Sequence, residues 1–283
     1  MPFQMFVDKN GVPYGEYGIY KGLNIGRQTS ILSVAERGLY YWNNFLKKDY
    51  EDDILLSYDW NMWPKNKNFQ PLNKSQAETY FINCINFLMT NVQSFEGFSA
   101  WIHPYQFSFN TSKNWKSSHA QAVGLSLLAR SMKMNLDKCS LSDIEILLEA
   151  FKIPINRGGL LDSTKTNQIW YSKIACASRP SPYVLNGFMF TIISLYDVYN
   201  QLNCRKALEI ANNALTTLTN SLDSFDCDGW SYYSLADCKP CTIHYHEIHV
   251  KQLKIIYDLT RLKELVYWEE RWRESLNKKK SVN

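Results

Sequence analysis

Apolar residues recur every three to four positions over most of this chain, and this spacing constrains the fold more than any other feature. Such a period predicts amphipathic helices with one buried face. The connections between the periodic segments are short, which favours antiparallel helical hairpins in a bundle or ring, and hence a mainly α fold. The helices are expected at about residues 31–46, 75–88, 117–134, 142–153, 184–201, 208–222, 245–262 and 265–276.

Two of these helices begin with a sequence that resembles a capping box. Ser75 is followed by Glu78, and Ser142 by Glu145, so each serine is expected to cap a helix whose third residue bonds back to it. Pro154 is expected to end the helix that starts at Ser142, because proline has no amide hydrogen to donate.

The N-terminal segment has a different pattern. Asn10-Gly11, a favoured tight-turn pair, separates two short apolar runs, so residues 1–26 are expected to form a β-hairpin extension. Residues 27–283 would then form the helical domain. The chain has neither a fixed-period repeat nor a linker that would divide this domain further.

Charge and composition exclude several classes of partner. The net charge is only +4 and the one basic run is at residues 278–280, so no nucleic-acid partner is expected. No stretch of 18 apolar residues predicts a membrane span. The first residues lack the basic and apolar regions of a signal peptide, and the seven cysteines are scattered. A cytoplasmic protein with reduced cysteines is therefore expected.

Tyrosines and histidines are concentrated between residues 228 and 252. If the second half of this stretch is helical, Tyr245, His249 and Gln252 fall at positions i, i+4 and i+7 and share one face. A titratable stripe in place of leucines indicates a candidate functional site. The alternative is a buried cluster whose members bond to one another.

Three stretches resemble one known family, the D-glucuronyl C5-epimerases, in their C-terminal domain. The family has S-F/Y-V-L-N-G-F followed by GLYD, and also W-x-S-A-M-A-Q-G and Y-H-x-x-H-I-x-Q-L. A G-x-x-Y sequence precedes the last of these and is similar to Gly229–Tyr232. The matching stretches are PYVLNGF at 182–188 with SLYD at 194–197, NWKSSHAQA at 114–122, and YHEIHVKQL at 245–253.

This resemblance implies a fold and an activity. The fold would be an (α/α) barrel or toroid of helical hairpins. The activity would be C5 epimerisation of uronate units, of the D-glucuronate to L-iduronate type, in glycan biosynthesis. The partner would be an acidic, uronate-containing polysaccharide, with no organic cofactor and no metal. A homodimer is an open alternative.

The resemblance also assigns candidate site residues. Tyr232 and Tyr245 match catalytic tyrosines that carry protons, and Tyr233 is an alternative to Tyr232 if the alignment shifts by one residue. The expected substrate-binding residues are Asn186, His249, Gln252, Trp115, Gln121, Arg179 and Tyr183.

One family segment differs in this chain. Where the family has W-Y-E-E-Y-P, which supplies a catalytic glutamate and a third tyrosine, the chain has WYSKIAC at 170–176. Tyr171 or Tyr183 could replace the tyrosine. Arg179, Lys173 or Lys239 could replace an arginine that is also missing. Two other functions stay open: β-elimination by a uronate lyase, and glycan binding without catalysis.

Two further patterns can each be interpreted as a binding site or as ordinary structure. Cys238 and Cys241, followed by His246 and His249, resemble the ligand spacing of a zinc knuckle, but a free cysteine-rich loop is the favoured interpretation. The tryptophan pairs 60/63 and 101/115 could stack on sugars or lie in the core.

Overall fold

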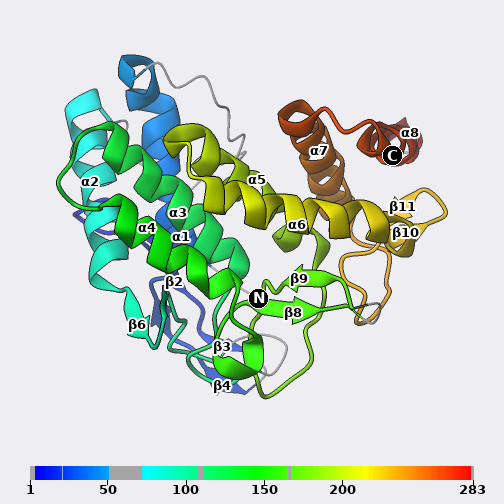
Figure 1. Cartoon of the computed structure of the whole chain (residues 1–283), viewed down its shortest axis with the longest axis horizontal. Helices are drawn as coiled ribbons and strands as arrows, with labels where there is room; N and C mark the ends of the chain where they lie inside the picture. The colour runs from blue at the N-terminus through cyan, green and yellow to red at the C-terminus, as the bar shows by residue number, and fades with distance from the viewer. Residues whose placement is uncertain (1–3, 21, 51–71, 107–110, 165–166, 282–283) are drawn as a thin grey trace.

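The computed structural model describes residues 4–20, 22–50, 72–106, 111–164 and 167–281. This part of the chain is mainly helical, as the apolar period predicts (Figure 1). The strand-like run at 54–56 and the tryptophans at 60 and 63 lie outside the described residues. The α-helices are α1 (Ile31–Tyr41), α2 (Lys74–Thr90), α3 (Ser118–Lys133), α4 (Leu141–Leu148), α5 (Leu185–Leu202), α6 (Arg205–Ser221), α7 (Ile243–Thr260) and α8 (Glu264–Ser281).

The helices are arranged as paired hairpins along a row. Helix α3 packs between α1 and α5, and α7 packs on the other side of α5. Each even-numbered helix packs on the odd-numbered helix before it. In Figure 1 the α1/α2 pair and the α7/α8 pair lie at opposite sides of the molecule. The hairpins are thus confirmed, but the described helices form an open row rather than the closed barrel that the resemblance implies.

The centre of this row is apolar on nearly every side. Most of α5 from Leu185 to Val198 is buried, which explains why its sequence shows no polar face. A charged pair joins α3 to α5: Arg130 Nη2 donates to Asp197 Oδ1 at 3.0 Å, and both side chains are buried. Such a paired charge is tolerated in a core, whereas either partner alone would be costly.

The helix caps differ from the sequence prediction. Helix α2 is capped by Asn73, which forms a reciprocal box with Gln76, and helix α4 by Ser140 with Asp143. Ser75 and Ser142 therefore lie inside the first turns, so the two predicted boxes were wrong by two residues. The Asn73 and Ser140 side chains accept from the third amide of each helix, which satisfies one otherwise unpaired donor.

The N-terminal hairpin is confirmed. Strand β1 (Gln4–Val7) pairs antiparallel with β2 (Pro13–Glu16), and Gly11 in their turn has φ +78°. The sheet continues past residue 26, because β5 (Arg27–Gln28) pairs with β2. A second hairpin, β3 (Ile19–Tyr20) with β4 (Leu23–Asn24), lies between them.

Three further two-stranded ribbons connect the helices. They are β6 (Gln93–Phe95) with β7 (Phe98–Ala100), β8 (Leu161–Ser163) with β9 (Ile169–Tyr171), and β10 (Asp226–Cys227) with β11 (Trp230–Ser231). None of the described helices is long and apolar enough to cross a membrane.

Candidate active site

Lys173 lies at the centre of the titratable side chains near the start of α5. It follows strand β9, and its Nζ donates to Asn186 Oδ1 and to the Tyr233 hydroxyl, each at 3.2 Å. Burial lowers the pKa of Lys173, whereas the neighbouring Tyr245 and Glu36 raise it. The ammonium group is therefore held among oxygen atoms in a partly enclosed position.

Gly187 makes room for this lysine. A Cβ atom at position 187 would lie 2.4 Å from Lys173 Cδ, so a larger residue would displace the lysine stem. Asn186 and Gly187 stand in the first turn of α5, where the sequence places the helix start. The space beside Gly187 is filled by the Lys173 stem.

Tyr233 and Tyr245 form a phenol pair beside Lys173. Their ring centroids are 4.6 Å apart, so each phenol lies in the environment of the other. Burial raises the pKa of Tyr233 to about 12, and the Tyr245 hydroxyl opposes this rise. Burial also raises the pKa of Tyr245, while the Lys173 charge lowers it. Each of the two phenols therefore affects the pKa of the other.

The backbone explains why Tyr233, and not Tyr232, meets Tyr245. The Leu185 amide donates to the Tyr233 carbonyl at 3.0 Å, and the Tyr232 amide donates to the Phe225 carbonyl at 2.8 Å. Consecutive extended residues point to opposite sides. The Tyr232 side chain consequently lies near Cys227, which raises the pKa of Tyr232, and Lys173 bonds to Tyr233 instead. The structure thus brings together Tyr233, Tyr245 and Lys173, and places Tyr232 elsewhere.

Glu36 supplies a carboxyl group from α1, at the other end of the helix row from Tyr245. Burial raises the pKa of Glu36 to about 8, and the Lys173 charge moderates this rise. At neutral pH this carboxyl is mostly protonated. Tyr17 lies beside it, and its pKa is raised by burial, by its neighbour Tyr105 and by Glu36. Sequence reasoning missed Glu36, because it stands more than 130 residues before Lys173 and belongs to no recognised motif.

His249 is held by a chain of hydrogen bonds. His246 Nε2 lies 3.0 Å from the Trp272 carbonyl oxygen, which only accepts, so this nitrogen carries the proton. His246 Nδ1 must then accept, from the Ser231 amide at 3.1 Å and from Ser231 Oγ at 2.8 Å. Ser231 Oγ donates its only proton to His246 Nδ1, so it must accept a hydrogen bond from His249 Nδ1, which lies 2.7 Å away. These bonds assign a lone pair to His249 Nε2.

Gln252 and His119 both contact the first half of α5. Gln252 Nε2 donates to the Asn186 carbonyl at 2.9 Å, which links α7 to the first turn of α5. His119 stacks on Phe190 with ring centroids 4.7 Å apart, and neither of its ring nitrogens has a partner among the described residues. Burial lowers the pKa of His119, and the Lys173 charge lowers it further. His119 is therefore a neutral neighbour of the lysine.

The structure places Trp115 and Gln121 in the scaffold of the domain. The Trp115 ring stacks on His103 at a centroid distance of 3.9 Å, so one of its faces is covered, and its Nε1 donates to the Tyr105 carbonyl at 3.0 Å. Gln121 accepts from the Trp101 amide and donates to the carbonyls of Ser99 and Leu147. Trp101 is buried as well, with its ring against Gly124.

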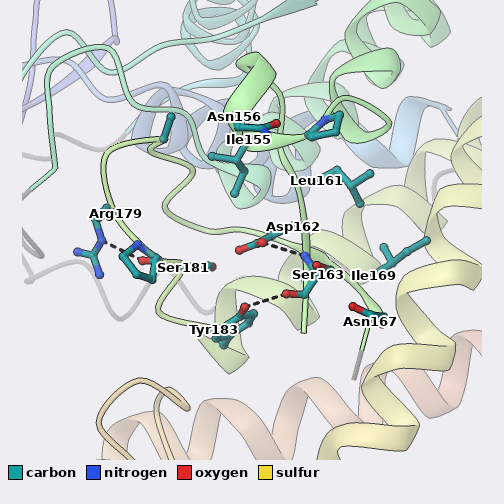
Figure 2. Close-up of a pocket in the computed structure, with 13 residues that line it drawn as sticks. Ile155, Asn156, Leu161, Asp162, Ser163, Asn167, Ile169, Arg179, Ser181 and Tyr183 are labelled. Atoms are coloured by element: carbon teal, nitrogen blue, oxygen red, sulfur yellow. Dashed lines mark hydrogen bonds between the residues drawn. The ribbon is translucent and has the colours of Figure 1, made fainter. Parts of the chain in front are cut away.

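Arg179 and Tyr183 lie apart from the phenol pair, in the wall of a separate hollow of about 540 Å³ (Figure 2). The other candidate replacements are also elsewhere. The Tyr171 ring packs edge-on against Phe151 in the core, and Lys239 is exposed. Lys173 is therefore the candidate cation that meets the matched tyrosine Tyr245.

The histidines of the zinc-like spacing are engaged in the chain of bonds through Ser231. In the part of the chain that the structure describes, no group of three or more histidine, cysteine, aspartate or glutamate side chains is placed to hold a metal ion. Cys241 lies against Ser231 Oγ at 3.3 Å, while Cys238 is exposed.

Comparison with known proteins agrees with the sequence resemblance. The family model described as D-glucuronyl C5-epimerase C-terminus matches residues 95–274, which is more than half of the chain. An uncharacterized protein of Methanocaldococcus jannaschii is 30% identical over 179 residues, covering 62% of this chain and 58% of the archaeal protein. The D-glucuronyl C5-epimerase of Caenorhabditis elegans is 28% identical over 176 residues, covering 56% of this chain and 28% of the nematode protein. The chain thus belongs to the D-glucuronyl C5-epimerase family through the C-terminal domain of that family.

Proposed function

We propose that this chain is a uronate C5-epimerase: it removes the C5 proton of a uronate unit in an acidic polysaccharide and returns a proton to the opposite face. The observation that carries this proposal is that Lys173 bonds to Tyr233 and interacts electrostatically with two kinds of proton carrier. The phenol pair Tyr233/Tyr245 comes from one end of the helix row, and the carboxyl group of Glu36 comes from the other.

Lys173 offsets the charge that develops in the reaction. Removal of the proton next to a carboxylate puts a second negative charge on the carboxylate oxygens, and an ammonium group fixed beside them stabilises that state. Asn186 and Tyr233 already hold Lys173 Nζ in place, so little reorganisation is needed when the substrate binds. Asn186 thus orients the cation.

In each direction of the reaction, one of the two carriers removes the C5 proton and the other returns a proton. In one direction the phenolate form of the Tyr233/Tyr245 pair takes the C5 proton, and the C5–H electron pair moves into the enolate. The protonated carboxyl of Glu36 then gives its proton to C5 from the other side, and the electron pair returns to form the new C5–H bond. In the reverse direction Glu36 accepts the proton and the pair donates one. Solvent restores the starting protonation.

A lyase is the second candidate, because a neutral carboxyl group can also protonate a leaving oxygen. Glu36 is mostly protonated at neutral pH and could deliver its proton to the 4-O substituent of the same enolate. The C4–O bond would then break, leaving a C4–C5 double bond. The products distinguish the two reactions: only the lyase shortens the polymer and gives an ultraviolet-absorbing end group.

The test is incubation of the protein with a glucuronate polymer in deuterated water, followed by NMR of H5 and by ultraviolet absorbance. Loss of the H5 signal without new absorbance would support the epimerase, and new absorbance would support the lyase. The Tyr245→Phe variant keeps the ring and removes the hydroxyl, so it separates chemistry from folding. If the wild type binds the polymer but exchanges no deuterium over days, the chain is a glycan-binding protein.

A further inference from the structure

His119 is a buried histidine whose two ring nitrogens are both unused. The residue is only 3% exposed, and neither Nδ1 nor Nε2 has a hydrogen-bond partner among the described residues. A buried polar group without a partner costs free energy, and such groups are few in native structures. The described part of the scaffold therefore leaves both nitrogens of this ring available to a ligand.

The backbone fixes the start of α3 against the segment that carries Lys173. The Ser118 amide donates to the Ser172 carbonyl at 3.0 Å, and Ser118 Oγ donates to the Tyr171 carbonyl at 3.0 Å. His119 and Lys173 are the next residues along the two segments that the first of these bonds joins. The Lys173 charge also lowers the pKa of His119, in agreement with this proximity. The first turn of α3 is thus part of the surroundings of the lysine.

Phe190 on α5 fixes the plane of the imidazole ring. The rings of His119 and Phe190 stack with centroids 4.7 Å apart and planes 4° from parallel. Thr191, the next residue, donates from Oγ1 to Ser118 Oγ at 3.1 Å and so holds α3 and α5 together at this level. Stacking covers a face of the imidazole, whereas both nitrogens lie at the edge of the ring. The hydrogen-bonding edge is therefore held in a fixed orientation without being used.

The protonation of His119 decides which groups can bind to it. The ring is neutral because burial and the Lys173 charge both disfavour its protonated form, so it offers one donor and one acceptor. A hydroxyl group also donates and accepts, and it therefore matches this edge. A carboxylate only accepts, and it would leave the lone pair of the ring facing a negative oxygen. The ring thus favours hydroxyl groups, while Lys173 favours the carboxylate.

Position 119 distinguishes this chain from the family pattern. The stretch NWKSSHAQA has His119 where the family motif W-x-S-A-M-A-Q-G has methionine. Methionine also packs well on aromatic rings, but its thioether donates no hydrogen bond. Packing on Phe190 alone therefore does not require an imidazole, and a chemical role explains the histidine better.

We propose that His119 contacts the substrate: its ring hydrogen-bonds to the C2 or C3 hydroxyl of the uronate whose carboxylate meets Lys173. These two hydroxyls stay unsubstituted in a unit that is linked through C1 and C4. The contact fixes the sugar ring relative to the lysine, and hence the direction in which the C5 proton points. This inference rests on the proposed function for the presence of a uronate in the site.

The test measures binding of the methyl glycoside of glucuronic acid, and of its 2-deoxy and 3-deoxy analogues, by calorimetry. His119→Met removes both nitrogens, and His119→Gln keeps a donor and an acceptor. His103→Met is the matched control. His103 is also buried, also stacks on an aromatic ring, and also has an Nδ1 without a partner among the described residues. Circular dichroism and the melting temperature verify that each variant is folded.

His119→Met should bind the glycoside about tenfold more weakly than the wild type, near the upper value for one hydrogen bond between neutral groups. One of the two deoxy analogues should bind the wild type about tenfold more weakly than the parent glycoside does. The same analogue should bind His119→Met as tightly as the parent. His119→Gln should recover part of the lost affinity, and His103→Met should match the wild type.

Nitrogen-15 NMR of labelled histidine gives a second measurement that needs no turnover. Addition of the glycoside should shift the ring nitrogen signals of His119, because a hydrogen bond forms there, and leave those of His103 unchanged. The melting temperature of His119→Met without ligand should equal or exceed that of the wild type, because a buried group without a partner is removed.

Three results would overturn the inference: equal affinity of the wild type and His119→Met for the glycoside, equal losses of both deoxy analogues in the two proteins, or unchanged His119 signals at saturation. A lower melting temperature of His119→Met with unchanged affinity would assign the imidazole to the scaffold. Deuterium exchange at C5 is measured separately. Binding that depends on His119 without exchange would refute the epimerase proposal alone. Exchange in the wild type, with glycoside affinity unchanged in His119→Met, would refute this inference alone.

Discussion

Lys173 Nζ lies 3.2 Å from the hydroxyl oxygen of Tyr233, so the cation and this phenol form one hydrogen-bonded unit. An ammonium group in contact with a phenol favours the phenolate, and the same group can pair with a substrate carboxylate. The contributions of the lysine and the phenol to catalysis therefore depend on each other, and loss of the lysine should weaken both.

We predict that Lys173→Met reduces deuterium exchange at C5 by about 10²–10³-fold, the usual cost of losing one group that stabilises developing charge. Its melting temperature should be unchanged or higher, because removal of a buried charge is often neutral or stabilising. Lys239→Met is the control, since Lys239 is exposed. Equal exchange in wild type and Lys173→Met would remove Lys173 from the mechanism.

A second prediction distinguishes the two neighbouring tyrosines. Tyr233→Phe should lower exchange by about 10²–10⁴-fold, as expected for a positioned acid–base group. Tyr232→Phe should leave the rate near that of the wild type, because Tyr232 lies near Cys227 and Lys173 bonds to Tyr233 instead. A large loss in Tyr232→Phe with none in Tyr233→Phe would restore the assignment made from the sequence.

Tyr232 and Tyr233 show what a sequence motif can and cannot predict. The sequence correctly places Tyr245 on a helix and Asn186 at the start of another, because apolar period and order along the chain carry that information. It leaves Tyr232 and Tyr233 as alternatives. That choice depends on which backbone amides and carbonyls pair with Leu185 and Phe225, and these contacts are distant in sequence.

Glu36 and Gln121 show that motif membership and position in the fold are different kinds of information. Glu36 belongs to no motif and comes close to Lys173 only because α1 and α5 both pack on α3. Gln121 belongs to a matching motif, yet its amide bonds to three backbone groups of the core. A motif marks positions at which the fold needs a given side chain, whether for chemistry or for support.

The pH dependence of exchange should identify Glu36. The proposed reaction needs the phenol pair and Glu36 together to have lost one proton. Below the pKa of Glu36, about 8, the fraction of protein in this state should therefore rise tenfold per pH unit. Above about 8 the rate should level off until the tyrosines ionise. Glu36→Gln should eliminate the break near pH 8 and lower the rate. A wild-type profile that is flat between pH 6 and 9 would contradict this assignment.

Glu36 should also affect stability in a predictable direction. Its pKa is raised from 4.5 to about 8 in the folded protein, so between these pH values the native state binds more protons than the unfolded state. The free energy of unfolding should therefore fall as the pH rises through this window, by linkage. Urea denaturation at several pH values should show a smaller decline in Glu36→Gln than in the wild type. An equal decline in both proteins would mean that groups other than Glu36 cause the pH dependence of stability.

The last prediction concerns the protonation of His249. The bonds through Ser231 assign its proton to Nδ1 and a lone pair to Nε2, whereas His246 has its proton on Nε2. Burial, with the charges of His246 and Lys173, lowers the pKa of His249 to about 3, so the ring should stay neutral through the working range of the protein. A neutral ring adds no positive charge that would compete with Lys173 for the substrate carboxylate. Nitrogen-15 NMR of labelled histidine distinguishes the two tautomers directly, without any assay of activity. His249 and His246 should give opposite tautomers, and Ser231→Ala should leave His249 with a mixture. Protonation of His249 near pH 6, or a proton on its Nε2 in the wild type, would contradict the assignment.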